Sequence, residues 1–130
     1  MSDSSSSNPF SELYGDLSDR LQGDRWQPDS DVFETAEQVI VHVELAGVAS
    51  EGLKVSLDGS AVRISGVREI DPGVPVERLH QMEIASGPFD RRIQIPVAFH
   101  KDQVSAHLAN GFLTVTLKKR GRKEVVVESE

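Results

Sequence analysis

The feature that most constrains this chain is a two-residue alternation of apolar and polar side chains, repeated over many short segments. An extended strand with this pattern buries one face and exposes the other. No helical period of useful length interrupts residues 32–117, so the pattern predicts an all-β sandwich and not a parallel α/β fold. The alternating apolar positions are Val39, Val41, Val43, Leu45, Leu53, Val55, Leu57, Val62, Ile64, Met82, Ile84, Phe89, Ile93, Ile95, Val104, Ala106, Leu108, Leu113, Val115 and Leu117.

Turn-forming residues separate these segments. Asn110-Gly111 lies between two alternating runs, and this dipeptide is the strongest short hairpin signal because both residues tolerate positive φ. We expect Leu108 and Leu113, on either side of the turn, to face the same core. Further turns are predicted at Asp58-Gly59, Asp71-Pro72-Gly73 and Gly87-Pro88.

The first 25 residues differ from the rest and are predicted to form a flexible or partly helical arm, followed by a sandwich over 26–117 and a tail over 118–130. The arm begins with a polar serine-rich run, which buries too little surface to order itself. An apolar stripe follows, with the three- and four-residue spacing of a short amphipathic helix. It either binds other proteins or packs on its own domain. The stripe consists of Phe10, Leu13, Tyr14, Leu17 and Leu21.

Composition narrows the possible functions. A chain of 130 residues is expected to form one domain, and its net charge of −7 argues against binding to nucleic acid or to anionic membranes. The absence of cysteine excludes a disulfide framework and thiolate metal sites. No apolar run approaches the roughly 20 residues that span a bilayer, and the N-terminus lacks the features of a signal peptide. We therefore expect a cytoplasmic protein.

Catalytic motifs are missing from the sequence. The histidines, His42, His80, His100 and His107, show no metal-ligand spacing, and no serine occupies a G-x-S-x-G turn. No glycine-rich phosphate loop is present. We expect neither an enzyme nor a bound cofactor or metal.

Five sequence motifs occur in order across residues 26–127. They are Trp26-Gln27-Pro28 with Asp31-Val32-Phe33-Glu34, Glu44-Leu45-Ala46-Gly47-Val48, Ile64-Ser65-Gly66-Val67-Arg68, Gly87-Pro88-Phe89-Asp90-Arg91-Arg92-Ile93 with Ile95-Pro96, and Ala106-His107-Leu108-Ala109-Asn110-Gly111-Phe112-Leu113.

Together these motifs resemble those of the small heat-shock protein family, whose members contain an α-crystallin domain. Ala46 stands where the family has proline, and Ala106, Asn110, Gly111 and Leu113 match its A-x-x-x-N-G-x-L signature. The resemblance implies an immunoglobulin-like β-sandwich. It also implies ATP-independent holding of unfolding client proteins, which then pass to ATP-dependent chaperones. The alternative is a monomeric co-chaperone or adaptor of the CS-domain kind.

The resemblance also implies self-association, through a dimer formed by strand exchange and then a higher oligomer. Arg91 shares the parity of Phe89 and Ile93, so its guanidinium should face the apolar side and need a carboxylate. The family's arginine at this place pairs across a dimer interface. Alternatively, Arg91 ends a strand and its head reaches water.

Two further segments carry expected contacts between subunits. Residues 67–81 form a long connection, in which Arg78-Leu79-His80 is the candidate for a strand exchanged with a partner; the alternative is a plain surface loop. Val125 and Val127 resemble the family's I-x-I anchor, which docks in a hydrophobic groove on another dimer. Alternatively, they complete a strand of their own domain.

Overall fold

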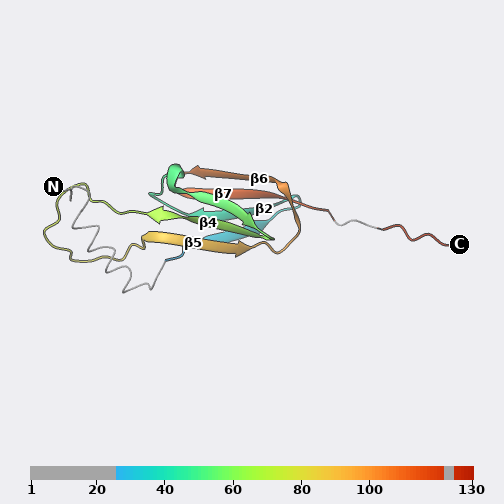
Figure 1. Ribbon diagram of the computed structural model, residues 1–130, viewed down its shortest axis with the longest axis horizontal. Helices are drawn as coiled ribbons and strands as arrows, with labels where there is room; N and C mark the ends of the chain where they lie inside the picture. Colours follow the sequence, from blue (N-terminus) through green and yellow to red (C-terminus); the bar gives the residue numbers. More distant parts are fainter. Residues whose placement is uncertain (1–25, 122–124) are drawn as a thin grey trace, which may run out of the picture.

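Two antiparallel sheets pack face to face in the computed structural model, which describes residues 26–121 and 125–130. One sheet, which we call sheet A, has the strand order β1-β2-β7-β6, and the other, sheet B, has the order β3-β4-β5 (Figure 1). The strands are β1 (Ser30–Glu34), β2 (Gln38–Glu44), β3 (Lys54–Asp58), β4 (Ala61–Arg68), β5 (Gly87–Gln94), β6 (Phe99–Ala109) and β7 (Phe112–Lys119), with a 3-10 turn, η2 (Ser50–Gly52), before β3.

The alternating residues form the core between the sheets, so the predicted all-β sandwich is confirmed. β2 and β7 lie side by side in the middle of sheet A and contribute residues of one parity, while β4 and β5 supply the facing layer. The buried apolar residues are Trp26, Val39, Val41, Val43, Leu45, Val48, Ala61, Val62, Ile64, Phe89, Ile93, Ile95, Phe99, Leu113, Val115 and Leu117.

The prediction is wrong for the segment around Met82 and Ile84. The connection between β4 and β5 covers residues 69–86 and contains no strand, and Ile84 is exposed. Two alternating residues are too few to specify a strand, and Pro72 and Pro75 remove backbone donors from the same connection. Ala106, expected to face the core, is also exposed.

The Asn110-Gly111 hairpin is confirmed, with φ angles of 54° and 81° at the two turn residues. Positive φ at both positions is the geometry of a type I′ turn. The carbonyl of Gly111 accepts a hydrogen bond of 2.7 Å from the amide of Leu45, which ties the turn to the end of β2. A Cβ atom on Gly111 would lie 3.3 Å from Cα of Ala46.

We expect Gly111→Val to lower the free energy of unfolding by about 1–3 kcal/mol, because a β-branched residue is strained at positive φ and would press on Ala46. Denaturant unfolding measures this loss, and light scattering should show a smaller assembly. Gly121→Val is the control, because a Cβ atom there meets nothing within 4 Å. An unchanged midpoint and particle mass for Gly111→Val would contradict the prediction.

Candidate functional site

The described residues offer little catalytic chemistry. Among residues 26–121 and 125–130, no three His, Asp or Glu side chains lie close enough to hold a metal ion. No helix in that part of the chain is long and apolar enough to cross a membrane. An open cavity of about 830 Å³ lies where β7 ends, and one wall is held by an ion pair of 2.6 Å between Lys119 Nζ and Glu34 Oε2. Its lining combines acidic and basic side chains with apolar ones, which include Val97 and Ala98.

The edges of the sheets provide a different kind of surface. In the described chain β1 and β6 border sheet A, and β3 and β5 border sheet B. An edge strand presents backbone donors and acceptors that another strand can use. β1 also exposes two large apolar side chains, Val32 and Phe33. This edge is therefore suited to pairing with a further strand.

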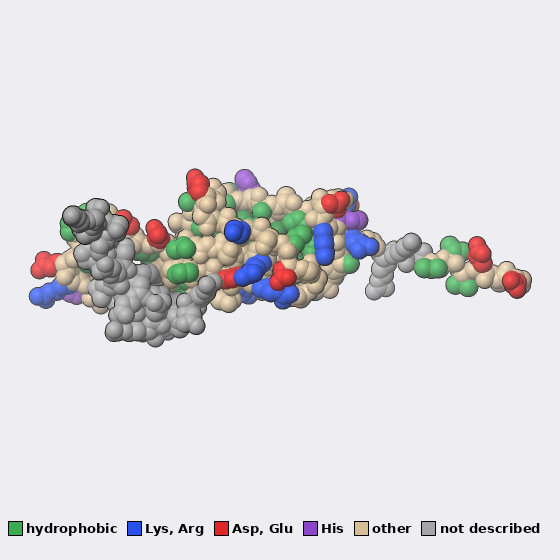
Figure 2. Space-filling view, viewed as in Figure 1, with side chains coloured by type: hydrophobic (Ala, Val, Ile, Leu, Met, Phe, Trp, Pro, Cys, Tyr) green, Lys and Arg blue, Asp and Glu red, His purple; other side chains and the backbone are tan. Residues whose placement is uncertain are grey.

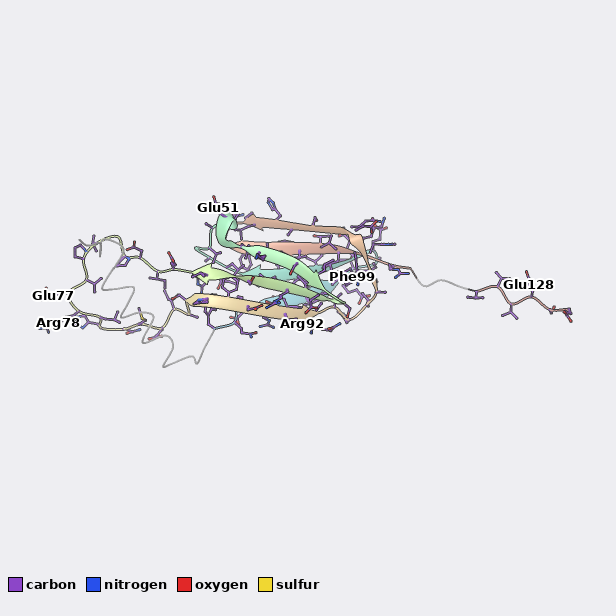
Figure 3. All side chains as sticks on the ribbon, in the orientation of Figure 1. Glu51, Glu77, Arg78, Arg92, Phe99 and Glu128 are labelled. Atoms are coloured by element: carbon purple, nitrogen blue, oxygen red, sulfur yellow. The ribbon has the colours of Figure 1, made fainter. Side chains whose placement is uncertain are left out.

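The long connection between β4 and β5 extends away from the sandwich. Glu77 and Arg78 lie at its far end (Figure 3). Within Arg78-Leu79-His80, Arg78 and His80 are exposed, Leu79 is half-buried, and none belongs to a strand. The segment is thus held away from its own sheets, and its exchange with a partner stays a prediction.

Arg91 is half-buried on β5, opposite Ile64 of β4. Its Nη1 donates a hydrogen bond of 3.3 Å to the carbonyl of Pro28, just before β1. Among the described residues no carboxylate forms an ion pair with Arg91, and the sequence-based expectation of a partner across a dimer interface is untested by one chain.

Among the described residues, Arg68 is the arginine that is classed as buried, with 8% exposure at the end of β4. Its Nε and Nη2 both donate to the carbonyl of Ala85, at 3.0 and 2.8 Å. Its Nη1 donates to the carboxylate of Glu44 at 3.4 Å and to the carbonyl of Ala46 at 3.3 Å. One guanidinium therefore joins the end of β2, the end of β4 and the base of the long connection.

Trp26 completes this cluster. Its ring lies 4.3 Å from the Arg68 guanidinium carbon, which is a cation–π contact, and 5.3 Å edge-on from the ring of Phe89. Its indole nitrogen donates to the carbonyl of Gly87 at 2.9 Å. In the sequence, Arg68 was identified only as the last residue of the Ile64–Arg68 motif. Its shared parity with Val62 and Ile64 is the signal that identifies it as inward-facing.

The outer face of sheet B is polar. Arg63 forms two hydrogen bonds to Asp90, at 2.9 and 2.6 Å, and these bonds raise the pKa of the Arg63 guanidinium. Arg92 pairs with Asp58 at 3.0 Å. Basic and acidic side chains lie together over this face (Figure 2). These two ion pairs make the face polar, so it is poorly suited to binding apolar segments.

The tail beyond β7 is apolar and exposed. Val125, Val126 and Val127 are 78%, 84% and 88% exposed, and they belong to no strand (Figure 1). The alternative that these residues complete a strand of their own domain is wrong. The valine pair expected to act as an anchor is available to another surface.

Half-buried apolar side chains line the two edge strands β3 and β6, of which β6 lies along the upper side of the sandwich in Figure 1. We call these residues the edge seam. These side chains pack against the core but remain partly exposed. Apolar side chains of another segment that bound there would bury the exposed part. The edge seam consists of Leu53, Val55, Leu57, Val104 and Leu108.

The predicted arm stripe, Phe10, Leu13, Tyr14, Leu17 and Leu21, lies outside the described residues. Its assignment as a client-binding segment is therefore untested. The expected domain boundary at residue 117 falls inside β7, which ends at Lys119.

Comparisons with known proteins agree on one family. The sequence profile described as the Hsp20/alpha crystallin family matches residues 31–129. The 17.8 kDa class I heat shock protein of Arabidopsis thaliana is 36% identical over 99 residues, which cover 74% of this chain and 63% of that protein. The spore protein SP21 of Stigmatella aurantiaca is 39% identical over 93 residues, which cover 72% and 55% of the two chains. The match thus spans less than two thirds of these relatives.

Solved structures have the same architecture. Heat shock protein 16.0 from Schizosaccharomyces pombe is 32% identical, with a TM-score of 0.67 over 80% of this chain and 85% of that chain. A small heat-shock protein from Xylella fastidiosa, at 24% identity, has a TM-score of 0.69 over 82% and 97% of the two chains. The second likeness bears on the fold alone.

Proposed function

This chain belongs to the Hsp20/alpha crystallin family, and from that premise we propose that it is an ATP-independent chaperone and not an enzyme. It holds unfolding proteins, prevents their aggregation and releases them to ATP-dependent chaperones. The observation that carries the proposal is the set of large apolar side chains that are exposed outside the core. Three of them are consecutive valines in the tail, at residues 125–127. Exposed apolar surface of this kind typically serves binding to other proteins.

The proposed subunit contact is an exchanged strand. Arg78-Leu79-His80 of one copy would add to the free edge of β1 of another, which satisfies backbone groups on both chains. The extension of the long connection away from its own sheets supports this contact. Arg91 would lie at the same interface, because its guanidinium already contacts Pro28 beside β1, and it would there meet a carboxylate of the partner.

The proposed contact between dimers is the valine tail on the edge seam. In an extended tail Val125 and Val127 face one way and Val126 the other. Burying two valines contributes roughly 3–6 kcal/mol before association costs, so a single tail binds weakly. Several tails on one particle bind together and still allow subunit exchange.

We expect the double variant Val125→Ser/Val127→Ser to reduce the assembly to particles of two chains, because both anchor side chains are lost while strand exchange remains. Native mass spectrometry and light scattering measure the particle mass. Val126→Ser is the matched control, because this side chain faces away from the docked surface and should leave the mass unchanged. An unchanged mass for the double variant would contradict tail docking, and single chains would contradict the exchanged strand.

The activity itself is tested with purified protein and a heat-labile enzyme in the absence of ATP. We expect near-stoichiometric amounts of the protein to suppress light scattering from the aggregating enzyme. A monomeric protein that suppresses no aggregation at any temperature would refute the proposal and favour an adaptor module.

A further inference from the structure

The turn between β6 and β7 contains a chemically labile pair of residues. The sequence has two asparagines, Asn8 and Asn110, which differ in the residue that follows. Asparagine is thermolabile, because the backbone nitrogen of the next residue can attack its side-chain carbonyl carbon. Asn8 precedes a proline, which has no N–H to lose. Asn110 precedes Gly111, which has an N–H and no Cβ to hinder the approach. Asn110 is therefore the asparagine of this sequence that is suited to the reaction.

The reaction is deamidation, and water is its only co-reactant. The nitrogen of Gly111 bonds to Cγ of Asn110, the Cγ–Nδ2 bond breaks, and ammonia leaves with the amide proton of Gly111. This step closes a five-membered succinimide ring without any transfer of electrons to an acceptor. Water then opens the ring at one of its two carbonyls, which yields aspartate or isoaspartate. Isoaspartate carries the main chain through Cγ, so it has one more backbone atom than the asparagine it replaces.

The folded turn holds the reacting atoms apart. Ring closure requires Cβ of Asn110 and the nitrogen of Gly111 to lie on the same side of the Cα–C bond of Asn110. The φ angles of 54° and 81° at these residues are those of a type I′ turn, in which ψ of the first residue is about 30°. In an L-residue this ψ places Cβ and the next nitrogen on nearly opposite sides of the bond. Asn110 is exposed to water, but the ring cannot close until the turn opens.

The contacts that keep the turn closed are few. β6 is an edge strand of sheet A, next to β7. Its pairing with β7 is interrupted between Phe99 and Val104 and then runs in register from Val104 to Ala109. The hydrogen bond from the amide of Leu45 to the carbonyl of Gly111 ties the turn to the end of β2. Edges and turns with exposed hydrogen bonds open more often than the core. The hairpin can thus open while β2 and β7 stay packed.

We propose that Asn110 is a deamidation site that is gated by opening of the β6–β7 hairpin. The closed turn protects the asparagine, and each opening exposes it to ring closure. A two-residue turn has no place for the extra backbone atom of isoaspartate, so the pairing of Val104–Ala109 loses its register once this product forms. Heating, which favours opening, then makes a reversible change permanent. The inference does not depend on the proposed function.

Mass spectrometry of the full chain, aged at mildly alkaline pH with and without guanidinium chloride, tests the gate. Trypsin releases residues 102–118 as one peptide, whose mass rises when the amide of Asn110 becomes an acid. We expect deamidation to be many-fold faster in the denaturant, because the unfolded chain samples the reactive ψ. Asn8, in the peptide of residues 1–20, is the internal control and should stay intact in both solutions. Equal rates for Asn110, or no conversion in the denaturant, would overturn the proposal.

Low concentrations of denaturant distinguish local opening from unfolding of the whole domain. Trp26 packs against Arg68 and Phe89, so its fluorescence reports the state of the core. We expect deamidation of Asn110 to rise several-fold while the fluorescence is still that of the folded protein. A rate that rises only together with the Trp26 transition would contradict gating by the hairpin.

Asn110→Asp separates the added charge from the added backbone atom. Aspartate also suits the first position of a type I′ turn, so this variant should keep a denaturant midpoint close to that of the native chain. We expect the isoaspartate form, separated chromatographically from aged protein, to unfold at a clearly lower denaturant concentration than Asn110→Asp. Equal midpoints would show that the turn accommodates the extra atom, and the proposed permanent change would then be wrong.

Discussion

Replacing Arg68 with alanine is expected to lower the free energy of unfolding by about 2–4 kcal/mol, since several buried interactions are lost together. The carbonyls of Ala85 and Ala46 would lose their donors, and Glu44 would lose its cation. The space beneath the ring of Trp26 would also be left empty. Urea unfolding at equal chain concentration measures the change, because the proposed assembly would make apparent stability depend on concentration.

Arg92→Ala is the matched control for this prediction. Arg92 also pairs with a carboxylate, but its side chain is 53% exposed and that of Asp58 is 57% exposed. Exposed pairs contribute about 0–1 kcal/mol, so the control should change little. Arg68→Met retains most of the side-chain volume and separates the loss of packing from the loss of the guanidinium. Equal losses for Arg68→Ala and Arg92→Ala would contradict the role assigned to Arg68.

The fluorescence of Trp26 provides an independent signal. It is the single tryptophan of the chain, and its ring is in contact with both Arg68 and Phe89. We expect its emission to shift in folded Arg68→Ala and to stay unchanged in Arg92→Ala.

The fold was predictable from sequence because its signals are local. Val39, Val41 and Val43 alternate along one strand, and the Asn110-Gly111 pair specifies the reversal that brings β6 against β7. Both signals act within a few residues. They agree with each other, as expected for a sequence that specifies one structure.

The candidate site was less predictable because the residues that contact one another in it lie far apart in the sequence. Arg68 obtains its partners from Glu44 and Ala85, which are far from it in sequence. Parity identifies Arg68 as inward-facing but does not name these partners. Parity also predicted that Arg91 faces inward and needs a carboxylate. Within one chain its guanidinium contacts the carbonyl of Pro28 instead. Val125 and Val127 are exposed and belong to no strand of their own domain, and their pattern in the sequence does not name the surface that would cover them.

A side chain at Gly66 would meet two rigid neighbours. A Cβ atom there would lie 2.8 Å from the carbonyl oxygen of Gly52 and 2.9 Å from Cζ of Phe89. The Phe89 ring is fully buried and packs edge-on against Trp26, so it has no free space to move into. The backbone oxygen of Gly52 is also fixed, by the turn that precedes β3. The glycine of the Ile64–Arg68 motif is therefore required by close approach and not by positive φ.

Gly66→Ala is accordingly expected to lower the free energy of unfolding by about 1–3 kcal/mol, because the extra methyl group overpacks the core. Gly52→Ala is the matched control: a Cβ atom there meets nothing within 4 Å, and its φ is not positive. The control should change stability by less than about 1 kcal/mol and can even raise it, since alanine restricts the unfolded chain. Denaturant midpoints compare the two variants, and Trp26 fluorescence reports whether the Phe89 ring has been displaced. If Gly66→Ala loses no more free energy of unfolding than Gly52→Ala, the prediction is contradicted. β4 and the turn before β3 could then separate without cost, and the motif would not require the close packing of Gly66 against Phe89.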